Sequence, residues 1–414
     1  MKGVTDQLIE IASKRDSGVL ARIERLHLET VRGISPSLES EYVARLNILF
    51  KDLERTIWAI RILGETTPRI KDYIVSYGER MSALLMEAAL REAGVQSRWM
   101  TGGEAGIITT DDYGEAKVLI DESRRLVNTR LLQLVEKNIV PVVTGFIGET
   151  PRGDTTTLGR GGSDYSAALI GALIGAGEVR LYTNVEGVLT GNPDRVPGAR
   201  TIPRLAVEEA MELSYLGAKK FHPRTFEPLK LNSIPIRILS FHNPTGESTV
   251  VEGSCDGDGG VKAVHVMDGL ALVKVRGPTM AGRIGTATEV MSLARDARVN
   301  ISAIAQPVSE TVITLVVKEA DAWKLRELAL EKLKPVGVVE EAEVESDASG
   351  LAVVGCGLSR VQGLSRIMTR LDGYDVKLLA RGIRGSSVTV ILPSGEAWDA
   401  ALRIHDEVIL GGQG

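Results

Sequence analysis

Apolar residues in the first 250 positions follow two spacings, and these alternate along the chain. Residues 41–63 place apolar side chains at helical intervals, which predicts one long amphipathic helix. Shorter apolar runs at 139–143, 178–183 and 234–240 are typical of buried strands. Further helical patterns lie at residues 7–13, 81–93, 128–137, 165–174, 207–216 and 223–231. This alternation predicts an α/β fold, with an open, mostly parallel sheet and helices on both faces.

The Gly-rich stretch at 252–260 interrupts this alternation and predicts a linker. Beyond it the pattern repeats with a period of roughly 80 residues, and residues 270–275 match residues 351–356. Each repeat has the order of a βαββαβ unit, a small sheet with helices on one face. Neither repeat places a nucleophile beside a base, so we expect both to be binding or pairing modules rather than catalytic ones. The predicted domains are residues 1–250, 261–345 and 346–414.

The loop at residues 144–164 carries the strongest sign of chemistry. It follows the predicted strand at 139–143, is rich in Gly and Thr, and leads into a helix. Glycine lets backbone N–H groups approach a ligand, and a helix N-terminus favours negative charge. Arg160 adds a planar group suited to a carboxylate or phosphate, and Asp164 is placed to orient a cation or an amine. The alternative is a solvated surface connection, although such connections usually span about 2–6 residues.

Composition narrows the class of protein. The 414 residues include 49 basic and 54 acidic side chains, a net charge of −5, and 4% aromatic residues. Nucleic-acid binding is typical of basic surfaces and aromatic platforms, so we expect no nucleic-acid partner. No apolar run approaches the ~18 residues of a membrane helix, and the start has no signal-peptide pattern. Cys255 and Cys356 offer neither a disulfide framework nor a metal cluster, which fits a reducing cytoplasm and a site without metal ligands.

The motifs that the sequence lacks and the charged side chains that it offers indicate the same kind of chemistry. The sequence lacks a Gly-x-x-x-x-Gly-Lys phosphate loop, a Gly-x-Gly-x-x-Gly motif after a first strand, and a visible nucleophilic triad. It offers instead the anion-binding side chains Arg160, Arg195 and Lys219 and the carboxylates of Glu79 and Asp164. Such a set suits phosphoryl transfer by positioning and charge stabilisation, with Mg²⁺ held mainly by nucleotide phosphates.

Two residues near these segments also have structural interpretations. Glu79 is predicted where the helix at 81–93 begins, and the helix dipole alone favours a carboxylate there. His222 precedes Pro223 and is interpreted as a structural turn residue rather than a catalytic one.

Six motifs, in order along the chain, resemble aspartate kinases of the amino-acid kinase family, which carry two C-terminal ACT repeats. The motifs are Lys2-Gly-Val-Thr-Asp6, Ser76-Tyr-Gly-Glu-Arg80, Thr101-Gly-Gly-Glu-Ala-Gly106, Thr144-Gly-Phe146, Gly159-Arg-Gly-Gly-Ser-Asp164 and Gly217-Ala-Lys-Lys-Phe-His-Pro223. The resemblance implies phosphorylation of the L-aspartate β-carboxylate by ATP with Mg²⁺, giving 4-phospho-L-aspartate on the route to lysine, threonine and methionine. It also implies an amino-acid effector, lysine or threonine, at the ACT repeats, and a homo-oligomer formed through them.

The resemblance also implies a role for particular residues. Arg160 would grip the α-carboxylate of aspartate, Glu79 its amine, and Asp164 would organise the reacting end, so that Arg160 and Asp164 are the catalytic pair. The implied aspartate-binding residues are Thr5, Glu79, Phe146, Arg160, Gly161, Gly162 and Ser163. The implied nucleotide-binding residues are Thr183, Asn184, Arg195 and Lys219.

The sequence departs from the family pattern in two places. The family begins with a strand that carries Lys-Phe-Gly-Gly, whose lysine neutralises the transferring phosphoryl group, whereas this sequence starts at the following motif. On that ground we expect the chain as written to be poorly stable and nearly inactive. The nucleotide loop has Asn184, Glu186 and Leu189 where the family usually has Asp, Asp and Tyr.

Two alternative functions follow from these observations. One is a catalytically silent regulatory subunit, or truncated form, without the phosphoryl-stabilising lysine. The other is an amino-acid kinase that acts on glutamate or acetylglutamate, although the Ser76–Arg80 motif and the repeated tail favour aspartate.

Overall fold

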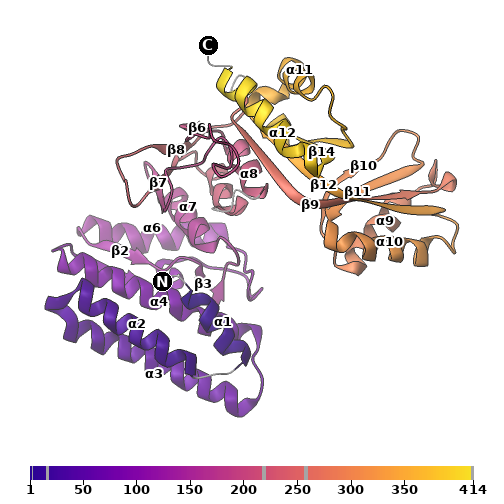
Figure 1. Cartoon of the computed structure of the whole chain (residues 1–414). Helices are drawn as coiled ribbons and strands as arrows, with labels where there is room; N and C mark the ends of the chain where they lie inside the picture. The colour runs from indigo at the N-terminus through magenta and orange to yellow at the C-terminus, as the bar shows by residue number, and fades with distance from the viewer. Residues whose placement is uncertain (2, 15–17, 217–220, 256–259, 412–414) are drawn as a thin grey trace. The chain divides into compact units, whose positions relative to one another are not determined.

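The computed structural model describes residues 1, 3–14, 18–216, 221–255 and 260–411. It divides into two compact units, residues 1–181 with 221–236, and residues 182–220 with 237–414. The two units are described separately below, with the labels of Figure 1.

The first unit begins with a helical layer. Its helices are α1 (Val4–Lys14), α2 (Gly18–Ile34), α3 (Glu39–Leu63) and α4 (Pro68–Glu92). The apolar stripe predicted at 41–63 is confirmed, since Leu46, Leu53 and Ile60 of α3 are buried in the core of this layer. Figure 1 shows the four helices packed side by side.

Helix α4 corrects the expectation that Glu79 lies at a helix start. Thr67 caps the helix, its hydroxyl accepting the Ile70 N–H, and Pro68 opens it, so that it begins eleven residues before Glu79. The helical pattern was predicted only for residues 81–93, but Gly78 is buried beside α1 and the helix already runs through it. Glu79 therefore lies mid-helix, where the helix dipole gives no reason for a carboxylate.

The rest of the first unit is a small α/β assembly. Its elements are β1 (Ser97–Met100), α5 (Gly102–Ala105), α6 (Ile120–Glu136), β2 (Val140–Val143), β3 (Ile147–Glu149), β4 (Thr155–Thr157), α7 (Gly162–Ile174) and the 3₁₀ helix η2 (Pro223–Lys230). Strands β1 and β2 pair in parallel. β2 is only partly buried and Val140 is exposed, so the prediction of a buried strand was wrong in that respect. Strands β3 and β4 form an antiparallel hairpin inside the predicted loop.

The second unit starts with a four-stranded sheet in the order β5-β7-β8-β6. Its elements are β5 (Val179–Thr183), β6 (Arg204–Leu205), α8 (Val207–Tyr215), β7 (Ile236–Ser240) and β8 (Ser248–Val251), and the division between units passes through β5 and β7. β6 and β8 pair in parallel. The parallel pairings with flanking helices confirm the predicted α/β class.

The C-terminal repeats share one six-stranded sheet, ordered β10-β11-β9-β12-β14-β13. The strands are β9 (Ala263–Arg276), β10 (Ile301–Ala305), β11 (Val312–Lys318), β12 (Glu341–Val354), β13 (Leu378–Arg381) and β14 (Ser387–Pro393). The helices are α9 (Thr286–Ala297), α10 (Glu319–Leu333), α11 (Val361–Arg370) and α12 (Ser394–Ile404), which continues as a π-helix (His405–Leu410). The first repeat has the predicted βαββαβ order, the second has the order βαββα within the described residues, and the two share one continuous sheet (Figure 1).

Two long strands, β9 and β12, interlock the repeats. Residues 341–345 of β12 pair with residues 272–276 of β9, which completes the first repeat. Residues 350–354 pair with residues 263–267, so that the start of β9 supplies the fourth strand of the second repeat. The predicted domain limits of 261–345 and 346–414 stay a prediction. The sequence assigned residues 263–267 to the first repeat, but in the sheet they lie beside the second.

A disulfide joins Cys255 and Cys356, contrary to the expectation of no disulfide framework. The residues are 101 positions apart in sequence, with Cα atoms 5.2 Å apart. They meet because the start of β9 runs beside the end of β12, where the Lys262 N–H donates to the Val354 carbonyl at 2.8 Å. The ligand atom of Glu209 lies within 4.8 Å of both sulfurs. The sulfurs are already bonded to each other, and the carboxylate is paired with the Lys262 ammonium at 2.7 Å.

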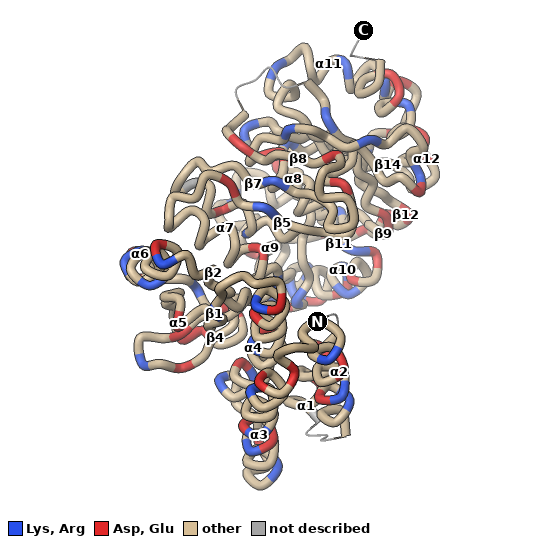
Figure 2. Tube along the Cα trace, turned by 90° about the vertical axis from the view of Figure 1, so that its left-hand side faces the viewer, with Lys and Arg blue, Asp and Glu red and all other residues tan. Residues whose placement is uncertain are grey.

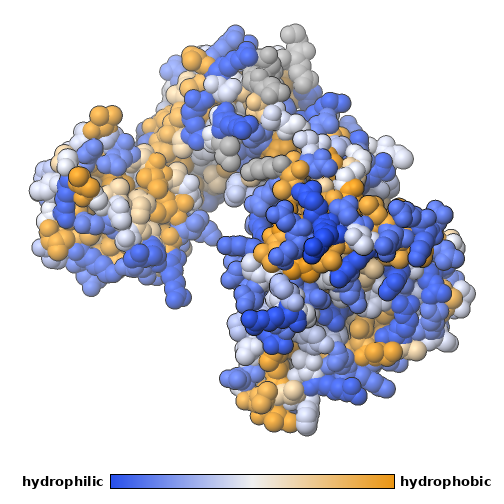
Figure 3. Space-filling model, turned by 180° about the vertical axis from the view of Figure 1, so that it is seen from behind, coloured by the Kyte–Doolittle hydropathy of each residue, from blue (hydrophilic) through white to orange (hydrophobic). Residues whose placement is uncertain are grey.

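Charged and apolar groups on the surface are mixed. Figure 2 shows basic and acidic residues interleaved along α3 and α6. On the face drawn in Figure 3, hydrophobic groups are interrupted by hydrophilic ones. Among the described residues, no helix has the length and apolar character needed to cross a membrane.

Candidate active site

The predicted anion-binding loop is a tight turn with Arg160 at its tip. Gly159 and Gly161 on either side have φ angles of +75° and +70°, a conformation that favours glycine. A Cβ on Gly161 would lie 2.2 Å from the His222 Cβ, so no side chain fits there. The Gly162 N–H closes the turn on the Gly159 carbonyl at 3.1 Å. Arg160 is therefore exposed on a backbone that is fixed on both sides.

His222 has the structural role that was predicted for it. It caps η2, and its Nδ1 accepts the Arg224 N–H at 3.3 Å.

The Thr144-Gly-Phe146 motif packs against this turn. Phe146 has a φ of +66°, and its N–H donates to the Ser166 hydroxyl at 3.1 Å. A Cβ on Gly162 would lie 2.8 Å from the Phe146 ring, and one on Gly145 would lie 2.9 Å from the Ser163 Cα. The structure thus brings Phe146 together with the predicted residues Gly162 and Ser163.

Asp164 occupies the first turn of α7, as predicted. Burial raises the pKa of its carboxyl to about 6. A half-buried acid in the helical turn that follows an exposed guanidinium gives two groups of opposite charge, which suit a small ligand with both signs of charge.

Thr5 on α1 lies against α4 at Gly78, the residue before Glu79. A Cβ on Gly78, next to Glu79, would lie 3.7 Å from the Thr5 hydroxyl. Burial raises the pKa of Glu79, an effect that the N-terminal ammonium partly offsets. No hydrogen bond or ion pair reaches the Glu79 carboxylate from the described part of the chain. A half-buried carboxylate in this state is suited to receive a cationic group.

Asp72 is a residue at this site that sequence reasoning missed. It lies on α4 two turns before Glu79 and is 3% exposed. Its carboxylate accepts hydrogen bonds from Gly114 and Thr157, of which Thr157 ends β4 just before the Arg160 turn. The available signal was the spacing of seven residues between two acids on one helix, which places both on the same face.

The predicted nucleotide residues lie in the second unit. Thr183 ends β5 and its hydroxyl donates to the Asn184 side-chain oxygen at 3.3 Å. The Arg195 guanidinium lies 5.3 Å from the ring centre of Trp398 on α12. Lys219 falls outside the described residues.

Glu186, one of the three departures from the family pattern, is held by its neighbours. Its carboxylate accepts the Asn243 amide at 2.8 Å, and its carbonyl accepts the Thr201 hydroxyl at 2.9 Å.

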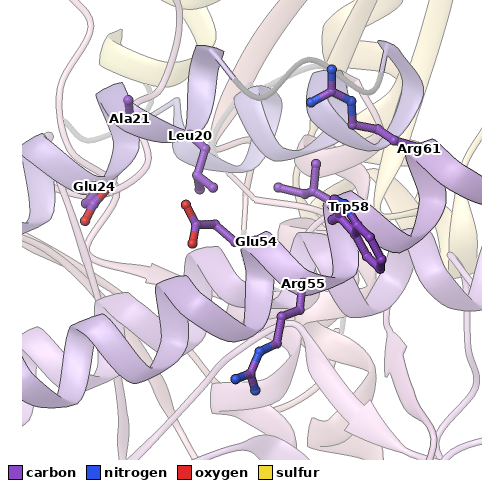
Figure 4. Close-up of a pocket in the computed structure, with 8 residues that line it drawn as sticks. Leu20, Ala21, Glu24, Glu54, Arg55, Trp58 and Arg61 are labelled. Carbon is purple, nitrogen blue, oxygen red and sulfur yellow. The ribbon is translucent and has the colours of Figure 1, made fainter.

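Three hollows in the first unit differ in their relation to these residues. One of about 430 Å³ lies between α2 and α3 (Figure 4), and none of the predicted residues lines it. Another, of about 640 Å³, lies beside α3, α4 and residues 153–155. A third, of about 360 Å³, is lined by Phe146, Asp72 and Thr157, among others. Of these three, the third alone includes a residue predicted to bind the ligand.

Two family profiles match the chain. That of the Amino acid kinase family covers residues 2–240, and that of an ACT domain covers residues 273–331. Aspartokinase 2, chloroplastic, of Arabidopsis thaliana is 31% identical over 398 residues, which cover 93% of this chain and 71% of that protein. The bifunctional aspartokinase/homoserine dehydrogenase 1, chloroplastic, of the same plant is 29% identical, and the chain spans 47% of its length.

Solved structures give the same result. E. coli aspartokinase III in complex with lysine and aspartate (T-state) has a TM-score of 0.81 and 26% identity, covering 98% of this chain and 91% of that one. The same protein in complex with aspartate and ADP (R-state) has a TM-score of 0.75 and 26% identity, covering 99% of this chain and 91% of that one.

Proposed function

Because this chain belongs to the amino acid kinase family, as an aspartokinase with C-terminal ACT domains, we propose that it phosphorylates L-aspartate under amino-acid feedback. The γ-phosphoryl group of ATP passes to the β-carboxylate, which gives 4-phospho-L-aspartate and ADP. The observation that carries the proposal is 31% identity to an aspartokinase across 93% of the chain. The Arg160 turn supports it, because within the family motif it presents an exposed guanidinium, a group suited to bind an anion.

We assign the aspartate contacts as follows. The Arg160 guanidinium binds the α-carboxylate as a fork, and the half-buried Glu79 carboxylate binds the amine. The rest of the aspartate-binding site is formed by Thr5, Gly161, Gly162 and Ser163. The Phe146 ring closes one side of it. Asp164 lies next to this set and orients the reacting end. The chemistry is then one of positioning and charge stabilisation, as in other phosphoryl transfers.

Nucleotide use is supported by E. coli aspartokinase III, whose structure holds ADP. We propose that Thr183, Asn184, Arg195 and Lys219 contact the nucleotide, and that Mg²⁺ enters with its phosphates. The mixed donor set of hydroxyl, amide and cations suits phosphate oxygens better than it suits a bare metal ion. A cytoplasmic location and a homo-oligomer held by the ACT domains are proposed on the family resemblance.

An ADP-release assay on the full chain tests the function. Aspartate, glutamate and N-acetylglutamate are each supplied with ATP and Mg²⁺, and ATP alone measures background hydrolysis. Release that depends on aspartate, with a hydroxylamine-trapped acyl phosphate as product, supports the proposal. Release that depends on glutamate or acetylglutamate would assign another amino-acid kinase. Aspartate binding without any release would assign the silent regulatory alternative.

We expect the full chain to bind lysine or threonine and to be inhibited by it. Lysine is the first candidate because the T-state structure of E. coli aspartokinase III contains it. Coupling between two sites is typically about 1–3 kcal/mol, so the aspartate affinity should fall about 5–150-fold at saturating effector. Calorimetry with all proteinogenic amino acids, followed by inhibition assays, measures this. A panel in which only aspartate binds would contradict regulation by an amino acid.

The raised pKa of Asp164 predicts opposite effects of pH on activity and stability. The carboxyl is ionised above about 6, so kcat/KM for aspartate should fall by about tenfold per pH unit below that value. The folded chain binds this proton more tightly than the unfolded chain does. The stability that comes from binding this proton is therefore fully present below the ordinary pKa of 3.8 and is lost as the pH rises through about 6, where the carboxyl of the folded chain ionises.

Asp164→Asn separates these two effects. The variant should be slow at every pH and should lack the acidic fall in activity. Denaturant unfolding at pH 8 should show it more stable than the wild type, because a buried charge is gone. A variant that keeps the wild-type pH profile would show that another group controls the acidic limb.

A further inference from the structure

We propose that Asp72 is a positioning residue for the phosphorylation of aspartate, because it fixes the Arg160 turn against the helix that carries Glu79. The inference rests on the proposed function and extends it to a residue that no motif marks.

Both carboxylate oxygens of Asp72 are used, and they reach two separate segments. Oδ2 accepts the Gly114 N–H at 2.9 Å and the Thr157 N–H at 2.8 Å. Oδ1 accepts the Thr157 hydroxyl at 2.8 Å. Asp72 is 3% exposed, and a carboxylate this buried is stable only with such partners. Three hydrogen bonds from one side chain make α4 an anchor for both segments.

The two segments that Asp72 binds lie against the Arg160 turn or lead directly into it. Thr157 is the last residue of β4 and stands three positions before Arg160. The Gly114 carbonyl faces Gly159, since a Cβ there would lie 3.3 Å from it. The Ala116 N–H also donates to the Thr157 carbonyl at 3.0 Å, which ties the segments to each other. A shift of Thr157 or Gly114 therefore moves the first glycine of the turn.

Helix α4 connects this anchor to the amine-binding carboxylate. Asp72 and Glu79 are seven residues apart, two turns on one face, which corresponds to about 10 Å along the axis. The residues held by Asp72 also line the cavity of about 360 Å³ that includes Phe146. Asp72 thus sets the spacing between the group that binds the amine and the group that binds the α-carboxylate. A ligand that must reach both groups at once is sensitive to that spacing.

The experiment compares the steady-state constants of the wild type and three variants of the full chain. Asp72→Ala removes all three hydrogen bonds and should raise the aspartate KM by about 10-fold or more, because misplacement by about 1 Å can cost on the order of 100-fold. The ATP KM should change less than about 3-fold.

Asp72→Asn is the conservative variant. Its amide oxygen can accept both backbone N–H groups, and its amide nitrogen can donate to the Thr157 hydroxyl, so the aspartate KM should return to within about 3-fold of wild type. Asp121→Ala, at an exposed acid on α6, is the matched control and should change neither constant.

Each result bears on the inference. An Asp72→Ala variant with an unchanged aspartate KM, or with equal changes in both KM values and kcat, overturns it. If Asp72→Ala does not fold, Thr157→Val replaces it. That variant removes one hydrogen bond and should raise the aspartate KM alone, by about 3-fold, and an unchanged value overturns the inference. A wild-type chain without aspartate-dependent ADP release would instead overturn the proposed function.

Discussion

Replacement of Arg160 by alanine is expected to raise the aspartate KM by about 30-fold or more, with the ATP KM within about 3-fold of wild type. A hydrogen bond to a charged group contributes about 1.5–3 kcal/mol, so loss of the two bonds of the guanidinium fork costs about 2 kcal/mol or more, and each 1.4 kcal/mol is a factor of about ten. Arg160 is exposed between two glycines of positive φ and lies outside every buried cluster among the described residues. The variant should therefore fold as the wild type does, and the effect should appear in binding.

Two further variants make the Arg160 result specific. Arg160→Lys keeps the charge but loses the planar fork, so it should lie between wild type and alanine. Arg152→Ala removes an exposed arginine from the turn of the β3–β4 hairpin and should leave both KM values unchanged. Equal increases in the aspartate and ATP KM values for Arg160→Ala would remove Arg160 from the α-carboxylate.

Sequence periodicity predicted the elements whose cause is local. The helix at α3, the strands β5 and β7, and the two C-terminal repeats follow from apolar spacing alone, because each depends on one face meeting a core. The Glu79 position was wrong for a local reason too. The helical pattern was predicted only for residues 81–93, whereas the helix begins at Pro68 and runs through Gly78, because a glycine inside a helix costs only about 1 kcal/mol and is tolerated where the helix is packed.

Long-range pairings could not be predicted in the same way. Asp72 meets Thr157 across 85 positions, and no local pattern encodes that pairing. Residues 263–267 are apolar apart from His265, but only their pairing with residues 350–354 assigns them to the second repeat. The place of Arg160 in an exposed turn before a helix was predictable because its glycines and that helix are its neighbours in the chain, and its role stays a prediction. The hydrogen bonds of Asp72 that hold this turn were not predictable, because they depend on how segments distant in sequence pack together.

The disulfide between Cys255 and Cys356 gives the largest expected effect on stability. It closes a loop across 101 positions, and a crosslink of that length stabilises by about 4–5 kcal/mol in the chain-entropy account. Both residues are held to α8 as well, because the Cys356 N–H donates to Glu209 and the Cys255 N–H donates to Glu208. The bond therefore fastens the segment leaving β8 to the end of β12.

Reduction is expected to lower the melting temperature of the transition that contains the C-terminal sheet by on the order of 10 °C. Calorimetry of the full chain with and without a phosphine reductant measures the shift. Cys255→Ser should melt at the temperature of the reduced wild type and should not respond to the reductant, because no crosslink remains to be broken. Thiol labelling under denaturing conditions without reductant should find no reactive thiol in the wild type and one in Cys255→Ser. Two reactive thiols in the wild type would mean that the chain is stabilised by packing of the β9–β12 pair alone, and reduction would then leave its melting temperature unchanged.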